Sequence, residues 1–192
     1  MSREDHMREI LYSQDGWDYG VTDVFDPAML RPIIENLKYK QEHEWDDYDE
    51  VKHAGSLILS VLTHGGMQMD FHFMIKDDVY CGIALCTTGQ LDETLFFGSK
   101  LPVIKEEEGE YLFFNYFHIA PDSRGHGEMW LRDVIMPYYG MVGYKAMYLK
   151  TSHPRSWSLY SRLGRTVGTY TTYSDNRLYK RKGRIYRLPV GQ

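Results

Sequence analysis

The stretch APDSRGHGEMWL, Ala120 to Leu131, joins a segment typical of a buried strand to a segment with helical periodicity. The nine residues before it, YLFFNYFHI, carry the aromatic and β-branched side chains that strands favour. Apolar residues then recur at helical spacing, at Trp130, Leu131, Val134 and Ile135. A strand, a glycine-containing turn and a helix in this order leave backbone N–H groups free at the positive end of the helix dipole. The stretch therefore indicates a site for a phosphate, although a plain change of direction explains the same residues.

Composition places the chain among ordinary folded proteins. It has 192 residues, of which 43% are hydrophobic and 26% are charged, so we expect one domain spanning 1–192. No apolar run is long enough for a membrane helix, and the start, MSREDHMREI, lacks the apolar segment of a secretory signal. We therefore expect a cytoplasmic protein without a membrane partner. The two cysteines, Cys81 and Cys86, lie in the strand-like VYCGIALC and are predicted to be packing residues.

The charge is unevenly distributed along the chain. Residues 1–140 hold 11 Lys/Arg and 26 Asp/Glu, whereas residues 141–192 hold 11 Lys/Arg and a single acid, Asp175. One part of the fold is thus basic although the whole chain carries a net charge of -5. Such a surface attracts nucleotides or nucleic acid, or it only neutralises the acidic part.

Helical and strand-like patterns alternate before the last strands. Strands are expected from Gly20 and at 71–86 (a hairpin turning at Asp77 and Asp78), 111–119, 145–152, 166–174 and 177–188. Helices are expected from Pro27, capped by Asp26, and at 50–62, 130–136 and 154–163, with a long connection over 87–109. Pro137 should end the third of these helices near Met136. The order predicts an α/β fold: a mixed, mostly antiparallel sheet of about six to seven strands, flanked by about four helices.

Two segments resemble the GNAT superfamily of N-acyltransferases. IAPDSRGHGEMWL is similar to the family's pyrophosphate-binding signature, Arg/Gln-x-x-Gly-x-Gly/Ala, with Arg124 and Gly127 in matching positions and Met129 in place of the last Gly/Ala. SWSLYSRLG, 156–164, is similar to the family's Ala-x-x-Leu-Tyr-x-Lys-x-Gly helix, with Arg162 in the basic position. His153 stands where many members have Asn. The resemblance covers most of the chain from Gly20 onward.

The resemblance implies acetyl-CoA as co-substrate, held between two strands that splay apart. Backbone groups of Phe117 and Ile119 would bind the pantetheine arm. The diphosphate would be cradled by Arg124, Gly125, His126, Gly127, Glu128 and Met129, and the cofactor would extend to His153 and Ser156. A primary amine would attack the thioester directly.

The same resemblance assigns Tyr160 as the general acid that protonates the departing thiolate. The base is less clearly indicated: Glu110, Asn115 and His118 lie on or beside the cleft strand, and His118 is our prediction because its ordinary pKa suits proton acceptance near neutrality. A structural histidine, or a chain of water molecules acting as the base, is the alternative. No His, Cys and carboxylate spacing typical of a metal site occurs, so no metal is expected.

The acceptor remains open, as do two other functions. The acidic residues before 140 would suit a cationic acceptor such as a polyamine, an aminoglycoside or a lysine side chain. Alternatively, basic and aromatic residues alternate in RLYKRKGRIYR, which suits a nucleic acid, as a base or a charged tRNA. Its contacts would come from Lys180, Arg181, Lys182 and Arg184. A non-catalytic module is the third interpretation, and a homodimer is a further expectation.

Overall fold

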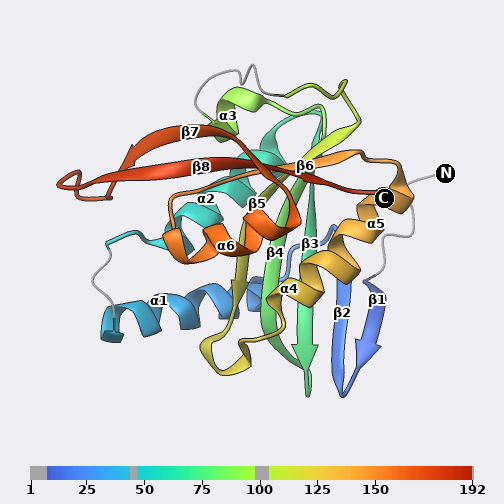
Figure 1. The fold of residues 1–192 in the computed structure, drawn as a ribbon. Coiled ribbons are helices and arrows are strands. Elements are labelled where there is room, and N and C mark those ends of the chain that lie inside the picture. Colours follow the sequence, from blue (N-terminus) through green and yellow to red (C-terminus); the bar gives the residue numbers. More distant parts are fainter. Residues whose placement is uncertain (1–7, 44–46, 98–103, 192) are drawn as a thin grey trace.

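One eight-stranded sheet organises the computed structural model, which describes residues 8–43, 47–97 and 104–191 (Figure 1). The strands are β1 (Glu9–Gln14), β2 (Trp17–Thr22), β3 (Met67–Lys76), β4 (Val79–Gly89), β5 (Tyr111–Ile119), β6 (Ala146–Thr151), β7 (Arg165–Tyr173) and β8 (Lys180–Pro189). Their order in the sheet is β1-β2-β3-β4-β5-β6-β8-β7, and only the β5–β6 pair is parallel. The predicted mixed, mostly antiparallel sheet is confirmed, with more strands than the six to seven expected. The strand that was not predicted, β1, is a mostly exposed edge strand without an alternating pattern.

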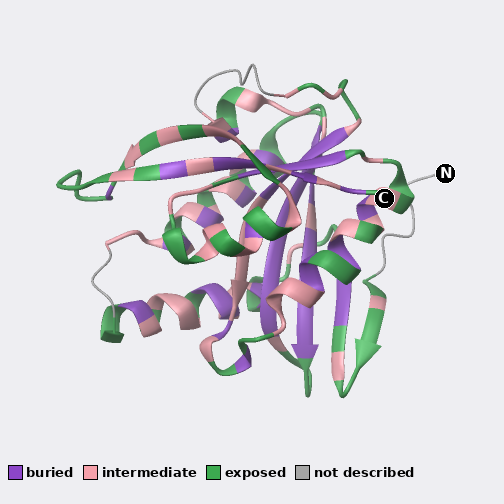
Figure 2. Cartoon of the chain, in the orientation of Figure 1, coloured by how far each residue is buried: buried purple, intermediate pink, exposed green. Residues whose placement is uncertain are grey.

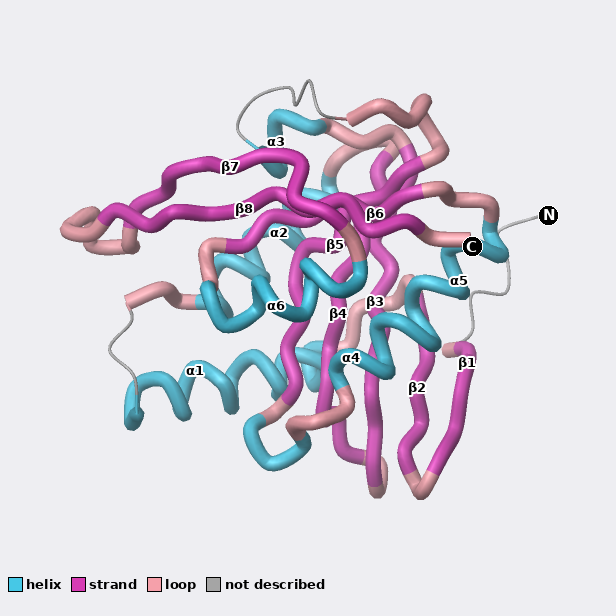
Figure 3. The backbone as a smooth tube through the Cα atoms, in the orientation of Figure 1, coloured by secondary structure: helices cyan, strands magenta, loops and turns pink. Residues whose placement is uncertain are grey.

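Helices cover both faces of this sheet. They are η1 (Pro27–Leu30), α1 (Arg31–His43), α2 (Glu50–Thr63), α3 (Glu93–Phe97), η2 (Pro121–Ser123), α4 (Gly127–Met129), the π-helical η3 (Trp130–Ile135), α5 (Met136–Val142) and α6 (Pro154–Leu163). Residues of α1, α2 and α3 pack into one hydrophobic cluster, and residues of η3, α5 and α6 pack into another. We name these two sides of the sheet the α1–α3 face and the α4–α6 face. The tube in Figure 3 shows the α4–α5 helix crossing the sheet away from α1.

Local sequence signals set several element boundaries. The Asp26 carboxylate accepts a hydrogen bond from the backbone N–H of Ala28 at 2.9 Å and so caps η1, where Pro27 begins the helix as predicted. Asp49 caps α2 in the same way, through Lys52 N–H at 3.0 Å. Asp77 and Asp78 both adopt positive φ angles, as a two-residue hairpin turn requires, and this confirms the predicted turn.

The helix after Gly127 runs past Pro137, so the expected end near Met136 is wrong. Residues 130–135 form wider π-type turns, and α5 then continues from Met136 to Val142, with Pro137 in its first turn. Pro137 lacks a backbone N–H, so the continuous helix forgoes one intrahelical hydrogen bond there, directly after the π-type turns. Gly143, at φ 109°, ends the helix instead.

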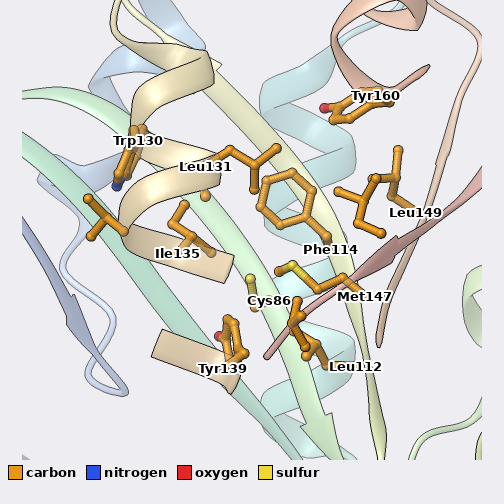
Figure 4. Packing of buried hydrophobic residues seen from close by; sticks show 14 of the residues in the cluster. Cys86, Leu112, Phe114, Trp130, Leu131, Ile135, Tyr139, Met147, Leu149 and Tyr160 are labelled. Carbon is orange, nitrogen blue, oxygen red and sulfur yellow. The ribbon is translucent and has the colours of Figure 1, made fainter. Parts of the chain in front are cut away.

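The central strands are buried on both faces, as the purple strands of Figure 2 show. Alternate residues of β3 contribute to opposite sides: Phe71 and Phe73 join the α1–α3 face, whereas Met74 joins the α4–α6 face. Trp130, Leu131 and other side chains of the helix pack onto the latter, in the cluster shown in Figure 4. Cys81 and Cys86 are both buried and unbridged, as packing residues should be.

Candidate functional site

The two parallel strands at the centre of the sheet separate after three residues. β5 pairs with β6 only from Tyr111 to Phe113, opposite residues 146–148, and the remainder of β6 pairs with β8 alone. A β-bulge at Asn115 bends β5 at this point, because Leu85 pairs with Tyr116 while Cys86 pairs with Phe114. The separation opens a cavity of about 1200 Å³, lined by both strands, by α6 and by Arg124.

At one end of this cavity lies the turn that follows β5. Among the described residues, no acceptor receives a hydrogen bond from the backbone N–H groups of residues 125–129, which open the helix of α4. The first intrahelical bond runs from Trp130 N–H to the carbonyl of His126, at 2.9 Å. Gly125 is exposed and adopts φ 107°, a conformation that favours glycine. These N–H groups are therefore available to an anion at a helix N-terminus.

Gly127 holds this turn close to the strand. A Cβ at this position would lie 3.2 Å from Ile119 Cδ1 and 3.4 Å from Phe117 Cε1, so a side chain would crowd the base of the turn. Glu128 points elsewhere and accepts a hydrogen bond from Arg162 Nη2 of α6 at 2.6 Å. Arg162 is thus engaged with a carboxylate of the turn itself, which also fixes α6 beside α4.

Arg124 and His126 direct their side chains away from the N–H groups. The Arg124 guanidinium stacks over the Tyr39 ring of α1, 4.5 Å from its centroid. His126 Nδ1 lies 3.1 Å from the Tyr19 hydroxyl, and its ring contacts Trp17 of β2. Since no side chain of these two residues fills the turn, its anion-binding capacity depends on the backbone.

Backbone groups of β5 also face the opening. Ala120 N–H donates to the carbonyl of Cys81 at 2.8 Å, so this pair is hydrogen-bonded, and alternation in an antiparallel ladder directs Phe117 and Ile119 backbone groups away from β4. The carbonyl of Ile119 is occupied by Asn36 Nδ2, at 2.7 Å. Within the described part of the chain, the N–H and carbonyl of Phe117 and the N–H of Ile119 have no hydrogen-bond partner, so they remain for a ligand between β5 and β6.

Helix α6 forms the wall on the β6 side. Its first turn is fixed by Ser156, whose hydroxyl donates to the carbonyl of His153 at 2.8 Å and lies 3.1 Å from Thr151 Oγ1. His153 itself is exposed at the cavity edge. Tyr160, 6% exposed, lines the cavity on the α4–α6 face, and burial raises its pKa, so its phenol stays protonated near neutral pH. Figure 4 shows its hydroxyl directed away from Leu149 and toward the side where Leu131 lies.

His118 lies on the opposite face. Alternation along β5 places it with Tyr116, which packs on the α1–α3 face, and the two rings stack at 6.0 Å. Burial, and then the nearby charge of Lys40, lower the pKa of His118 to about 4. The imidazole is therefore neutral at pH 7 and can accept a proton, but it is a weaker base than its ordinary pKa suggests.

The two other candidate bases are engaged elsewhere. Glu110 forms an ion pair with Lys145 and does not line the cavity. Asn115 does line it, but its Oδ1 accepts a hydrogen bond from Thr87 at 2.7 Å, and an amide is not a base at neutral pH. Of the three, His118 alone combines a titratable side chain with a position in the cavity.

Several cavity residues were not predicted from the sequence. Lys40 of α1 and Glu50 of α2 form a buried ion pair at 2.6 Å. The hydroxyls of Tyr48 and Tyr116 lie 3.2 Å apart next to them, and Lys150 of β6 faces the same chamber. These residues are distant in sequence and carry no local motif. In the sequence they are ordinary lysines, tyrosines and a glutamate, residue types that many protein surfaces contain, so nothing there could have assigned them to a cavity.

The basic residues proposed for nucleic acid lie on the β7–β8 hairpin, which projects from the sheet in Figure 1. Arg181 forms an ion pair with Asp47 at 3.1 Å, and Arg184 stacks on Trp157 of α6 at 4.1 Å. Lys180 lies near the Tyr173 ring, and Lys182 is exposed. Nucleic acid binding by this hairpin stays a prediction.

Two features of the described residues bear on other classes of function. No group of three His, Cys, Asp or Glu side chains in this part of the chain is arranged to hold a metal ion. Within the same residues, no helix has both the length and the apolar character to span a membrane.

No protein-family model and no curated protein matches the sequence. Solved structures do match the fold. An acetyltransferase from Salmonella typhimurium that modifies the N-terminal serine of ribosomal protein L7/L12 is 10% identical, with a TM-score of 0.56 over 95% of this chain and 99% of that one.

Two further matches are structures with bound acetyl-CoA. The GNAT superfamily phosphinothricin acetyltransferase of Sinorhizobium meliloti is 15% identical, with a TM-score of 0.54 over 90% of this chain and 89% of that one. NAA60 of Arabidopsis thaliana is 11% identical, with a TM-score of 0.54 over 91% and 99%. With its splayed parallel strands and the open turn after β5, the chain has the fold of the GNAT acetyltransferases.

Proposed function

We propose that the protein is an N-acetyltransferase that moves an acetyl group from acetyl-CoA to a primary amine. The observation that carries this proposal is the set of unengaged N–H groups at residues 125–129, in the turn that begins at Arg124, a residue that lines the β5–β6 cavity. A diphosphate fits a helix N-terminus with free amides. The similarity to acetyltransferase structures with bound acetyl-CoA supports the choice of ligand.

The cavity suits the remaining parts of the coenzyme. The backbone groups of Phe117 and Ile119 would bind the amide-rich arm that precedes the sulfur, as a further strand would. His153 and Ser156 lie at the start of α6 beside the same opening. When bound, acetyl-CoA supplies a thioester carbonyl that an amine attacks directly.

The two faces of the sheet supply the proton transfers. Neutral His118, on the α1–α3 face, would accept a proton from the incoming amine, directly or through water. The new C–N bond forms as the C–S bond breaks, and the protonated phenol of Tyr160, on the α4–α6 face, would give its proton to the departing thiolate. The orientation of both reactants by the cavity would supply much of the rate.

The direct test is calorimetric titration with acetyl-CoA, accompanied by thermal unfolding. At about 100 times its dissociation constant, the ligand should stabilise the fold by about 2.7 kcal/mol. We expect saturable binding with one site, and turnover with at least one primary amine in an acceptor screen. Absence of binding would overturn the proposal.

Replacement of Tyr160 by Phe tests the general acid separately. We expect the variant to bind acetyl-CoA as the wild type does and to lose about a hundredfold in kcat, since general acid catalysis contributes on this order. Tyr138→Phe is the matched control, because Tyr138 is half-buried beside Tyr139 and does not line the cavity. Equal kcat values for wild type and Tyr160→Phe would remove Tyr160 from the mechanism.

A further inference from the structure

The charges that line the cavity are mostly positive. Among the described residues that line it, six are Lys or Arg and one is acidic: Lys40, Arg124, Lys150, Arg155, Arg181 and Lys182, against Glu50. Glu50 is already paired with Lys40. Among the described lining residues, a cationic acceptor would therefore find a single carboxylate, that of Glu50, whose Oε1 is paired with Lys40 and whose Oε2 has no hydrogen-bond partner. The charges of the cavity, not those of the whole chain, act on a bound molecule.

Among these cations, the position of Lys150 shows which ligand it can contact: the acceptor and not the coenzyme. In β6, Tyr148 packs on the α1–α3 face and Leu149 on the α4–α6 face, so alternation places Lys150 with Tyr148. Its ammonium lies 6.0 Å from the ring centroid of Phe97 in α3 and 5.7 Å from that of Tyr170 in β7. Lys150 thus faces the chamber of His118.

The phosphate-binding turn lies on the other side. A Cβ added at Gly127 would meet the side chains of Phe117 and Ile119, which pack on the α4–α6 face. Lys150 consequently does not serve the diphosphate. Within the part of the chain that the structure describes, no carboxylate lies within 4.0 Å of its ammonium, and the side chain is exposed. A lysine between two aromatic rings, without a carboxylate counterion among the described residues, offers a charge to a molecule in the chamber. Burial by the surrounding side chains lowers the pKa of Lys150, and a bound carboxylate would favour its charged form.

We propose that Lys150 binds a carboxylate of the acceptor, so that the preferred substrate of this enzyme is an amine flanked by acidic groups. The inference rests on the acetyltransferase activity proposed above. A carboxylate next to the amine would orient it toward His118, since both side chains face one chamber. The rings of Phe97 and Tyr170 would hold the apolar part of such a molecule.

The experiment compares acceptors of matched size. Three peptides of equal length, each with a free N-terminus, carry Asp-Glu, Asn-Gln or Lys-Arg at the second and third positions, and free aspartate and glutamate form a second arm. The enzyme should acetylate an acidic member with a kcat/KM about tenfold above the neutral one, mainly through KM. The arm that reacts tells whether the acid belongs to a peptide or to a small molecule.

Lys150→Gln should remove this preference and leave the neutral peptide and the Kd of acetyl-CoA within about threefold of wild type. Lys150→Glu should reverse the preference toward the basic peptide. Lys76→Gln is the matched control, an exposed strand lysine outside the cavity. The proposal is overturned when the wild type prefers the neutral or basic peptide, or when Lys150→Gln affects all acceptors alike.

Direct binding keeps this test independent of turnover. Calorimetric titration of the acidic peptide into wild type and Lys150→Gln should show about a tenfold weaker Kd in the variant. If the acidic peptide binds through Lys150 but acetyl-CoA does not bind, the result would contradict the proposed activity and support carboxylate binding by Lys150. If acetyl-CoA binds and the acidic peptide reacts equally well in wild type and Lys150→Gln, the result would support the activity and overturn carboxylate binding by Lys150.

Discussion

The two faces of the sheet differ in how they use the same central strands. On the α4–α6 face lie the turn with unengaged backbone N–H groups, next to the cavity residue Arg124, and the buried phenol of Tyr160, which lines the cavity. On the α1–α3 face the cavity is lined by side chains, among them the Lys40–Glu50 ion pair and Lys150. In the proposed function, main-chain groups on one face would bind acetyl-CoA, whereas the side chains on the other face can change without altering the fold.

β5 connects the two faces. Phe117 and Ile119 point to one and Tyr116 and His118 to the other, because successive residues of a strand alternate. A reaction between molecules held on opposite faces has to take place in the gap where β5 and β6 separate. The comparison therefore predicts that damage to one face leaves binding at the other intact.

The largest expected effect comes from Gly127→Asp on the α4–α6 face. Aspartate is favourable in the first turn of a helix, so the fold should persist, but its negative charge next to the free N–H groups would repel a diphosphate. We expect the Kd of acetyl-CoA to rise by at least about a hundredfold, or roughly 2.7 kcal/mol, by calorimetry.

Gly127→Asn is the matched control, because it adds a side chain of the same shape without the charge. It should weaken acetyl-CoA binding by about tenfold, through crowding of Phe117 and Ile119. Equal affinities for wild type and Gly127→Asp would show that the turn does not hold the diphosphate. Acidic peptide binding at Lys150 should be unchanged in both variants.

The second effect concerns a polar cluster beneath α5 on the same face. His72 is fully buried in β3, its Nε2 lies 3.0 Å from the Tyr139 hydroxyl, and that hydroxyl donates to Asp70 at 2.8 Å. Burial lowers the pKa of His72 to about 3, so in the folded chain it stays neutral while in the unfolded chain it gains a proton below its ordinary pKa near 6.5.

Stability that depends on neutral His72 is complete above pH 6.5 and falls as the pH drops toward 3. Between pH 6.5 and 5 this residue alone should cost about 2 kcal/mol of unfolding free energy. Urea denaturation at several pH values measures it, and His72→Gln, which can still hydrogen-bond to Tyr139 but does not titrate, should lose this part of the slope. The remaining slope in that range belongs largely to His118, whose pKa is also lowered. An unchanged slope in the variant would contradict the assignment.

The α4–α6 face was the more predictable from sequence. Three segments carry it: the strand before Ala120, the open turn and the helix that contains Tyr160. Each is a single continuous stretch of sequence whose local pattern predicts its own structure. The path of the helix through Pro137 was not predictable in this way, because a π-type segment depends on packing around Trp130 and its neighbours.

The α1–α3 face was largely invisible in the sequence. Lys40, Glu50 and Lys150 come together only through tertiary structure, from elements separated by up to about a hundred residues. Net charge and the cavity lead to different expectations for the acceptor: the acidic residues before 140 suggest a cationic one, while the cavity draws its lysines and arginines from both parts of the chain. Side-chain chambers of this kind follow from long-range contacts and not from a local pattern.

The smallest effect is expected where the β7–β8 hairpin meets the start of α2. Asp175 of the hairpin accepts hydrogen bonds from His53 Nε2 and from Asp49 N–H, both at 3.0 Å, and Asn176 N–H donates to Asp47 at 2.6 Å. These contacts hold the hairpin beside the Lys150 chamber. Exposed ion pairs contribute little to stability, so Asp175→Asn should lower the free energy of unfolding by less than about 1 kcal/mol.

A local measurement is more sensitive than global stability for this variant. Release of the hairpin should speed trypsin cleavage after Arg177 and Lys180 severalfold and raise the KM for the acidic peptide, while the Kd of acetyl-CoA stays unchanged. Asp18→Asn, at the exposed end of β2, where Asp18 accepts from Ser13, is the control and should alter none of these. A loss of acetyl-CoA affinity in Asp175→Asn would mean that the two faces are not independent, because the hairpin contacts only the acceptor side through this aspartate.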